Sequence, residues 1–320
     1  MAPEAPVSDI LSALQELSTE TSLSEAELTG AVEEAVAATY RRLVADDPEV
    51  RARVDLSRGT FEVFRRGGDG EVALPVAAPD FARHAAAAVR AAVAEHLVEA
   101  GRQRVLDEAA GRRGQLVDVV VERQAGQAWY VDMAGIGGVL PPDEQIPGEQ
   151  LVPRQHLKVV VLDGWRRTHD AVVVVSRSHP LLLQRLLEQE VPELVSGQVV
   201  IRGIAREPGR RSKVAVAAPE GDVDPQGACI GPRGIRHRAV SSELGAEQVQ
   251  IVAWADDPAT YIANGLIPAA VRSVRVDEQT RTAHVAVASD QLSLAIGRGG
   301  ENARLVAKLS GLRIDIAAAE

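Results

Sequence analysis

The 320-residue sequence contains a single cysteine, Cys229, which excludes an intramolecular disulfide and any cysteine-based zinc site. We interpret Cys229 as a small buried residue rather than as a nucleophile. The seven histidines are scattered, with no H-x-x-x-H pair and no arrangement of a nucleophile beside a base. The sequence therefore predicts a protein with no catalytic residues, no metal site and no cofactor.

Long apolar segments are also missing. No run of 18 apolar residues occurs, and the N-terminus has no positively charged region followed by an apolar one. We therefore expect a cytoplasmic protein that makes no membrane contact, and we expect a monomer. Aromatic residues make up only 3% of the chain against 46% hydrophobic residues, so its cores must be built from Val, Leu, Ile and Ala.

The most informative feature that is present is a pair of short glycine-containing loops. Residues 231–234 read Gly-Pro-Arg-Gly, residues 297–300 read Gly-Arg-Gly-Gly, and their first glycines are 66 positions apart. At the same offset Val240 aligns with Val306. Each loop lies between two helix-like runs and precedes an apolar strand. This pattern indicates an internal repeat of a whole small domain.

The chemistry of these loops suits contact with an RNA backbone. A single G-x-x-G is weak evidence, because glycines commonly end helices or fill turns, but two copies in one setting are stronger. A turn without side chains at its ends lets a nucleic-acid backbone approach, and the free N–H groups of the next helix then face phosphates. Both loops resemble that of the KH domain, which binds about four nucleotides of single strand. Neither loop carries an acidic residue that would repel phosphate.

Basic residues gather near the first loop. The densest groups are Arg206, Arg210, Arg211 and Lys213, and then Arg233, Arg236, His237 and Arg238. A solvated face is the usual explanation of such charges, but the second group begins inside the loop, so we favour RNA contact. The candidate RNA-binding residues are Gly231, Pro232, Arg233, Gly234, Arg236, Arg238, Arg211, Lys213, Gly297, Arg298, Gly299, Gly300, Asn302 and Arg304.

The net charge of −10 is unevenly distributed. Residues 1–110 hold 11 basic and 20 acidic groups, a net charge of −9, whereas the repeat region is close to neutral. Because phosphate contacts supply much of the affinity for nucleic acids, we expect modest, partly apolar RNA binding. We expect a different partner for the acidic end of the chain.

The first 110 residues predict an α/β domain with a long helix at its end. A capping-box pattern, apolar residues at helical spacing and short alternating runs define its elements. The expected elements are helices near 10–17, at 28–44 and at 81–110, a hairpin at 52–63 and a loop at 67–70. The charged face of the long helix is either solvated or a docking surface, and the sequence leaves both open.

Five short strands are predicted next, which is typical of a small OB-type barrel. Their expected ranges are 115–122, 128–133, 137–140, 157–162 and 171–176. The string Gly-Val-Leu-Pro at 138–141 and the later Pro-Gly-Glu at 147–149 resemble the S1-type RNA-binding barrel. Trp129, Tyr130 and Trp165 are candidates for stacking on bases, Trp129 and Tyr130 above all. The alternative is that one of that adjacent pair fills the barrel, since alternation allows only one to face inward.

After the barrel the order of elements is α-β-β-α-α-β, and it occurs twice, as in bacterial-type (type II) KH domains. Residues 256–258 are the only linker between the copies. We therefore expect the two domains to pack rigidly into one continuous surface. The predicted fold is multidomain α+β: an N-terminal domain at 1–110, an S1-type barrel at 111–177, and KH domains at 178–255 and 256–320.

This layout resembles the NusA family of bacterial transcription factors from end to end. The most specific strings are Ser-Arg-Ser-His-Pro at 176–180, Gly-Ala-Cys-Ile-Gly-Pro-Arg-Gly at 227–234 and Gln-Leu-Ser-Leu-Ala-Ile-Gly at 291–297. The first 110 residues match in layout more than in wording. In the second loop, Gly299 stands where many relatives carry an acidic residue, a change that we expect to be tolerated.

The resemblance implies a non-catalytic elongation factor. It implies that residues 1–110 bind the RNA polymerase core, that the barrel and KH pair hold nascent RNA, and that pausing, intrinsic termination and antitermination are modulated. Other Nus-type antitermination factors are implied as further partners. Some relatives carry C-terminal acidic repeats, and we expect their regulation to be absent here. The alternative is an RNA-only barrel-and-KH subunit of an RNA-processing or RNA-degrading assembly, which would not need the acidic first 110 residues.

Overall fold

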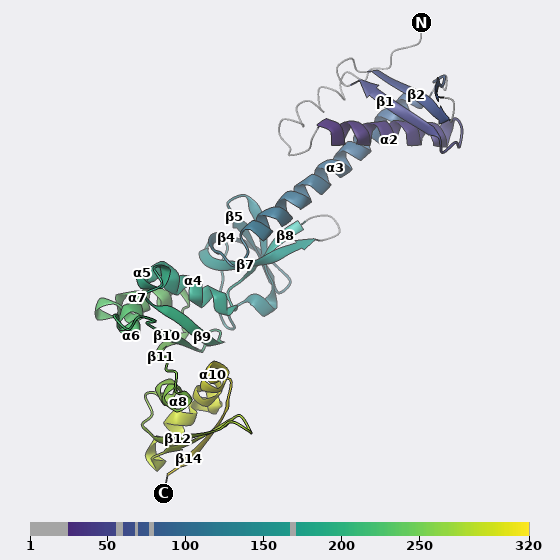
Figure 1. Ribbon diagram of the computed structural model, residues 1–320. Helices are drawn as coiled ribbons and strands as arrows, with labels where there is room; N and C mark the ends of the chain where they lie inside the picture. The colour runs from purple at the N-terminus through teal and green to yellow at the C-terminus, as the bar shows by residue number, and fades with distance from the viewer. Residues whose placement is uncertain (1–24, 56–59, 68–69, 77–79, 167–170, 320) are drawn as a thin grey trace. The chain divides into compact units, whose positions relative to one another are not determined.

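The computed structural model describes residues 25–55, 60–67, 70–76, 80–166 and 171–319 (Figure 1). The predicted helix near 10–17, the capping residue Ser24 and the turn at 57–59 lie outside these residues. The described residues divide into two compact units. One consists of residues up to Glu108 together with the Trp165–Val172 segment, and the other of the remaining residues from Ala109 on.

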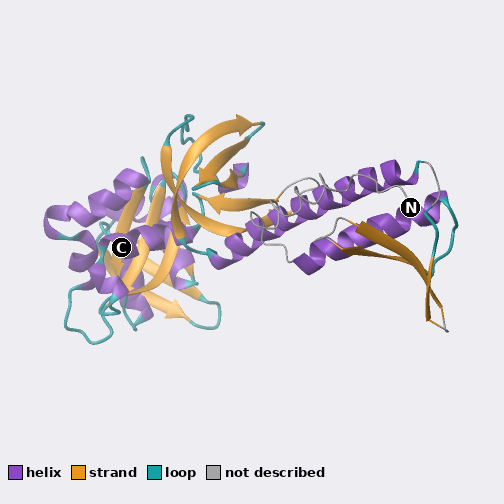
Figure 2. Ribbon diagram, turned by 90° about the horizontal axis from the view of Figure 1, so that it is seen from above, coloured by secondary structure: helices purple, strands orange, loops and turns teal. Residues whose placement is uncertain are grey.

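The first unit is a three-stranded antiparallel sheet in the order β1-β2-β3, with helix α2 packed on it (Figure 2). Its core joins Val and Ala side chains to Phe81, whose ring lies 5.9 Å from that of Tyr40. Strand β3 was not predicted, and its first residue falls in the predicted loop. Its four residues are all exposed, so the sequence shows no alternation of apolar and polar residues there. The elements are α2 (Glu25–Leu43), β1 (Val50–Asp55), β2 (Thr60–Gly67), β3 (Gly70–Ala73) and α3 (Phe81–Gly111).

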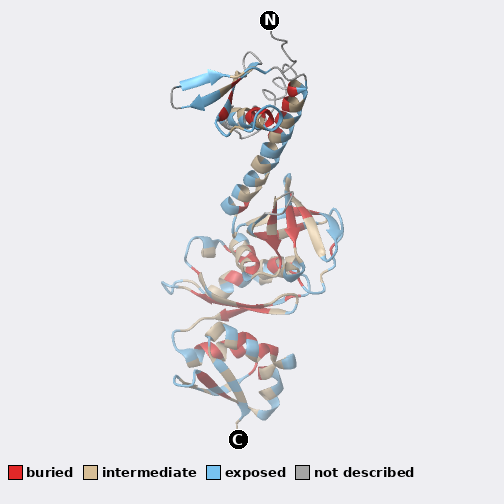
Figure 3. Ribbon diagram, turned by 90° about the vertical axis from the view of Figure 1, so that its right-hand side faces the viewer, coloured by how far each residue is buried: buried red, intermediate tan, exposed pale blue. Residues whose placement is uncertain are grey.

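The predicted five-stranded barrel is confirmed as a closed barrel in the order β4-β5-β6-β8-β7. Strands β6 and β8 pair in parallel. The buried residues of the barrel strands are mostly valines, and Figure 3 colours the buried parts of the chain red. Position 138 in β6 favours glycine, because an added Cβ would come within 2.8 Å of Val131 Cγ2. The strands are β4 (Leu116–Ala125), β5 (Ala128–Met133), β6 (Ile136–Leu140), β7 (His156–Arg166) and β8 (Ala171–Ser176).

The first repeat, residues 178–255, has a mixed sheet in the order β11-β10-β9, in which β10 is parallel to β11 and antiparallel to β9. It shares one hydrophobic core with the barrel, through Val160 and Ile146 on the barrel side. Its elements are α4 (Pro180–Glu190), α5 (Pro192–Val195), β9 (Val200–Glu207), β10 (Arg211–Ala217), α6 (Pro225–Ile230), α7 (Ile235–Glu243) and β11 (Gln248–Ala253).

The second repeat, residues 256–320, has the same mixed topology, with strand order β12-β13-β14 and β13 parallel to β14. The predicted α-β-β-α-α-β order is confirmed here, and the first repeat adds only the short α5. The elements are α8 (Pro258–Leu266), β12 (Val271–Asp277), β13 (Thr282–Val287), α9 (Leu292–Ile296), α10 (Glu301–Ser310) and β14 (Arg313–Ala318).

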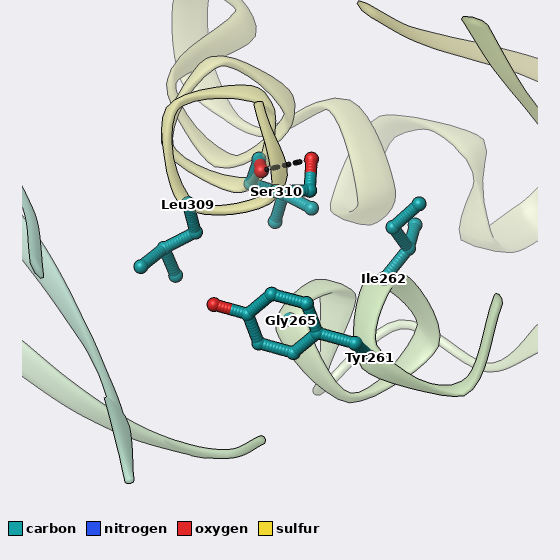
Figure 4. Close-up of a pocket in the computed structure, with 6 residues that line it drawn as sticks. Tyr261, Ile262, Gly265, Leu309 and Ser310 are labelled. Atoms are coloured by element: carbon teal, nitrogen blue, oxygen red, sulfur yellow. Dashed lines mark hydrogen bonds between the residues drawn. The ribbon is translucent and has the colours of Figure 1, made fainter. Parts of the chain in front are cut away.

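The two repeats are in contact. Helices α8 and α10 lie against the sheet of the first repeat, where Ala215 and Val252 pack with Tyr261. Tyr261 on α8 and Leu309 on α10 line the same small site, and burial raises the pKa of the Tyr261 hydroxyl to about 12 (Figure 4). Gly203 allows α10 to approach, since a Cβ there would already touch Leu309 at 3.4 Å. The expected contact between the repeats is therefore present.

Candidate nucleic-acid interface

The two G-x-x-G loops have the same backbone conformation. Gly231 has φ 73° and ψ 169°, and Gly297 has φ 77° and ψ 170°. The third residues of the two loops also share one conformation, with φ 53° and ψ 23° at Arg233 and φ 60° and ψ 25° at Gly299. Each loop then enters a helix, α7 or α10, through a left-handed glycine. The internal repeat predicted from the sequence is thus also a repeat of loop geometry.

The first glycine of each loop is required by a side chain that crosses over it. An added Cβ on Gly231 would lie 2.7 Å from Arg236 Cγ, and one on Gly297 would lie 2.8 Å from Asn302 Cβ. Arg236 and Asn302 are 66 positions apart, and each donates a hydrogen bond to a main-chain carbonyl of the preceding helix. Arg236 Nη1 donates to the carbonyl of Ala228 at 2.7 Å, and Asn302 Nδ2 donates to the carbonyl of Ala295 at 3.0 Å. Each side chain ties the loop to the helix before it.

A second brace holds the third position of each loop. Arg238 Nη1 donates to the carbonyl of Arg233 at 2.6 Å, and Arg304 Nη1 donates to the carbonyl of Gly299 at 3.3 Å. These two arginines are again 66 positions apart. The two middle residues of each loop, Pro232 and Arg233 in the first and Arg298 and Gly299 in the second, are exposed. The loops are consequently held in shape by their own domains before any ligand arrives.

The outer side of the loops is cationic with apolar neighbours. Arg233 and Arg298 are exposed, and within the described part of the chain their guanidinium groups have no hydrogen-bond or ion-pair partner. Ile235 is 60% exposed at the start of α7, and Leu294 is 45% exposed in α9. Charged groups that can meet phosphates therefore lie beside aliphatic side chains that can meet bases, without any acidic residue inside either loop.

The structure corrects two of the predicted RNA-binding residues. Lys213 is completely buried, because its face of the first sheet is covered by the second repeat, and its Nζ donates to the carbonyl of Gly265 at 2.7 Å. Asn302 is 2% exposed and braces its loop from inside. Neither side chain is available to RNA. Arg206, counted among the basic groups, is also interior, where its Nη2 lies 2.9 Å from Glu247 Oε2.

The remaining candidates lie at the surface or close to it. Arg236 is half-buried and paired with Glu193, whose Oε2 lies 2.9 Å from Nη1. Arg211 is partly exposed at the start of β10, where its Nη2 donates to Gln248 Oε1 at 2.7 Å. The sequence reasoning missed the acidic residues that hold these cations. Glu193 pairs with Arg236 and Glu301 with Arg211. The partners lie more than 40 positions apart in each pair, so opposite charge was the only sign of these pairings that the sequence offered.

The barrel aromatics separate as strand alternation requires. Trp129 lies on the same side of β5 as the buried Val131 and Met133, so it belongs to the inward face. Tyr130 lies on the other side, where the guanidinium of Arg123 sits 4.2 Å from its ring centre. Trp165 is 54% exposed. Of the adjacent pair, the structure leaves Tyr130 as the candidate for base stacking.

Other kinds of site find little support in the described residues. Among them no group of three His, Cys, Asp or Glu side chains could hold a metal ion, and no helix is long and apolar enough to span a membrane. Cys229 is buried, as interpreted from the sequence, and burial raises the pKa of its thiol to about 11. Near neutral pH it is therefore a thiol rather than a thiolate, which is the nucleophilic form.

Three family models match the sequence. A model described as the NusA N-terminal domain matches residues 9–68. A model described as the NusA-like first KH domain matches residues 177–254, and one described as the NusA-like second KH domain matches residues 258–320. The two KH matches coincide closely with the two structural repeats.

Curated relatives match most or nearly all of the chain. A Bacillus subtilis (strain 168) protein is 36% identical over 97% of this chain and 90% of its own length. A Mycobacterium tuberculosis (strain H37Rv) protein is 37% identical over 96% of this chain and 92% of its own. A Thermus thermophilus protein is 43% identical over 78% of this chain and 65% of its own. All three are named transcription termination/antitermination protein NusA.

Proposed function

The chain belongs to the NusA family of transcription termination/antitermination proteins, and from this premise we propose that it binds the RNA polymerase core and holds the emerging transcript. It does no chemistry on the RNA. By holding single strand it changes whether a hairpin forms and which path the RNA takes, and so modulates pausing, intrinsic termination and antitermination. The work is divided among an N-terminal domain at 1–110, an S1-type barrel at 111–177 and KH domains at 178–255 and 256–320.

The observation that carries the RNA-binding half of this proposal is the pair of matched loops. The two loops have one backbone geometry and each ends in a helix N-terminus. Each also presents an exposed arginine that has no partner among the described residues, and together these features suit two successive stretches of a phosphate backbone. The contact between α8 and the first sheet keeps the repeats adjacent. One strand can then run from the first loop to the second.

The polymerase-binding half rests on the acidic first third. Residues 1–110 carry a net charge of −9, so they are poorly suited to RNA and well suited to a basic protein surface. Other Nus-type factors are further proposed partners, and we propose that the chain acts as a monomer in the cytoplasm. The second candidate function is an RNA-only subunit of a processing or degrading assembly, which the repeats and barrel would also suit.

A charge-reversal variant of the loops tests RNA binding. Its four substitutions are Pro232→Asp, Arg233→Asp, Arg298→Asp and Gly299→Asp. A matched control makes the same charge change on the opposite face of the second repeat's sheet, with Ser273→Asp, Arg275→Asp, Arg313→Asp and Ala317→Asp, all at exposed positions. We expect the loop variant to lose affinity for single-stranded RNA much more than the control, with unchanged circular dichroism in both. Equal affinities would contradict RNA binding at the loops.

Salt dependence measures how many phosphates are involved. For single strands each phosphate contact contributes about 0.7 to the slope of log affinity against log salt. We expect a shallow slope for the intact protein, because the repeat region is nearly neutral, and a shallower one still for the loop variant. A steep slope that the loop variant retains would place the phosphate contacts elsewhere.

Retention of polymerase tests the other half. The full chain and the fragments 1–110 and 111–320 are used to capture the RNA polymerase core from nuclease-treated lysate. We expect the full chain and the fragment 1–110 to retain it, and the fragment 111–320 to retain much less. If neither fragment nor the full chain retains polymerase, that result contradicts polymerase binding and favours the RNA-only function.

A further inference from the structure

Six charged residues bridge the two repeats beside the second loop. Glu207, at the end of β9, pairs with two cations of α10: its Oε1 lies 2.6 Å from Arg304 Nε and 3.9 Å from Lys308 Nζ. Glu301, the first residue of α10, pairs in return with the first repeat, 3.2 Å from Arg210 Nε and 3.8 Å from Arg211 Nε. We call these six residues the junction cluster.

The junction cluster is attached to the second loop directly. Arg304, held by Glu207 through a hydrogen bond that lowers the pKa of that carboxyl, also donates to the loop carbonyl of Gly299. Glu301 follows Gly300, the last loop residue, without a gap. The β9–β10 turn of the first repeat is therefore anchored at two points to the loop of the second.

Within the described residues the first loop has no such attachment to the other repeat, although its backbone conformation is the same. The position equivalent to Glu301 is the exposed Ile235. The residue equivalent to Arg304 is Arg238, which braces its own loop and, in the described part of the chain, has no acidic partner. The acidic residue at position 301 is thus a specific difference between two otherwise matched sites.

The two arginines that pair with Glu301 both remain accessible, although the side chain of Arg211 is only 33% exposed. A guanidinium group has five N–H donors, and the side chain of Arg210 remains 60% exposed while it pairs with Glu301. The junction cluster holds four basic and two acidic residues, an excess of two positive charges. Its Glu301 follows the exposed Arg298 of the second loop by three residues. Carboxylates that are already engaged repel an incoming phosphate less than free ones would.

We propose that the second loop is completed by the first repeat. Arg210 and Arg211 bind a phosphate of single-stranded RNA adjacent to the phosphate met by Arg298, and Glu207 and Glu301 are positioning residues that hold the two halves of the site together. This inference rests on the proposed RNA-binding function. The bound group is a phosphodiester on a strand that crosses the junction between the repeats, so the second repeat alone forms only part of its site.

The variant Glu301→Ile separates positioning from simple charge. It gives the second loop the residue that the first loop already carries at the equivalent position. Removing a negative charge beside a phosphate site should by itself tighten RNA binding, whereas loss of the positioning contact should weaken it. In the full-length protein we expect single-stranded RNA affinity to fall about fivefold, the equivalent of one net hydrogen bond. The control Asp290→Asn removes an exposed charge ahead of α9 and should leave affinity equal or slightly higher.

A double-mutant cycle tests whether the arginines share one strand. We expect Arg210→Ala to reduce affinity about tenfold, as for loss of one charge-assisted hydrogen bond. Combined with Arg298→Ala, the loss should be smaller than the product of the single losses, because once one contact is gone the strand leaves the site. Arg275→Ala removes the same charge from the far face of the second sheet and should combine with Arg298→Ala multiplicatively.

The outcomes separate this inference from the proposed function. If the four-aspartate loop variant loses RNA while Arg210→Ala and Glu301→Ile bind as the unchanged protein does, the composite site is overturned and RNA binding at the loops stands. If the loop variant also keeps full affinity, both the composite site and RNA binding at the loops are contradicted. A rise in affinity for Glu301→Ile would show that Glu301 acts only as a repelling charge and would overturn its positioning role.

Discussion

The ammonium group of Lys213, on the sheet of the first repeat, donates to the main-chain carbonyl of Gly265, on the first helix of the second repeat, over 2.7 Å. The same group also donates to Gln250 of the neighbouring strand. A residue that reads as a surface cation in the sequence is therefore part of the contact between domains. Its burial lowers the pKa of Lys213 to about 8, with a smaller contribution from the charge of Arg211.

Lys213 makes the stability of the domain pair depend on pH in the alkaline range. Between pH 8 and the ordinary lysine pKa of about 10.4, the folded state has lost this proton while the unfolded state keeps it. Stability therefore rises with pH across that window, by on the order of 3 kcal/mol. We expect urea unfolding to show this rise in the unchanged protein relative to Lys213→Met, which cannot titrate. The difference between the two proteins isolates the lysine, because Cys229 titrates equally in both, and a flat difference would contradict the prediction.

Arg177 should be among the most sensitive residues between the barrel and the first repeat. Its guanidinium is 1% exposed, with Nη2 at 2.6 Å from Glu149 and Nη1 at 2.8 Å from Glu243 on α7. Arg177→Met leaves two carboxylates without their cation and is expected to destabilise by about 3–5 kcal/mol. The control Arg113→Met removes an exposed pair with Asp163 and should change stability by less than about 1 kcal/mol. Thermal unfolding of the full chain checks both, and equal shifts would contradict a structural role for Arg177.

The loop glycines should differ sharply in their tolerance of alanine. Gly297 has a backbone conformation that only glycine adopts readily, and an added Cβ would lie 2.8 Å from the backbone nitrogen of Asn302. Gly297→Ala should therefore destabilise the second repeat by about 2–4 kcal/mol. Gly299 has open space around it and a left-handed conformation, so Gly299→Ala should cost only about 1 kcal/mol. Hydrogen exchange of the α9 and α10 amides measures the two, and equal exchange rates would contradict the loop geometry.

Tyr130 should contribute to RNA binding while its neighbour Trp129 contributes to the barrel. Stacking of a base on an aromatic ring is worth about 1–3 kcal/mol, so Tyr130→Ala should weaken single-stranded RNA binding about tenfold with little loss of stability. Tyr130→Phe keeps the ring and should bind as before. Trp129→Ala should instead lower the melting temperature, since it removes a ring from the inward face of β5. Unchanged RNA affinity in Tyr130→Ala would contradict stacking at this position.

Much of the fold was accessible from local patterns. The five barrel strands, the long helix α3 and the order of elements in both repeats follow from periodicity and turn residues, and the structure agrees with them. The exception is β3, whose four exposed residues carry no alternation to detect. Helices and strands leave a sequence signature only where one side of the element is buried.

By itself the sequence determined the two loops: a glycine where a side chain would clash, a residue five positions on to cross over it, and an arginine turned outward. These steric requirements involve residues within about ten positions of one another, so the local sequence is enough to show them. Only the tertiary structure decided which cations face solvent. Arg211 and Lys213 lie two apart on one face of β10, yet one is at the surface and the other is completely buried. The reason is that α8 and α10, which begin 47 and 90 positions beyond Arg211 respectively, cover that face, and burial depends on such distant packing rather than on the residue itself.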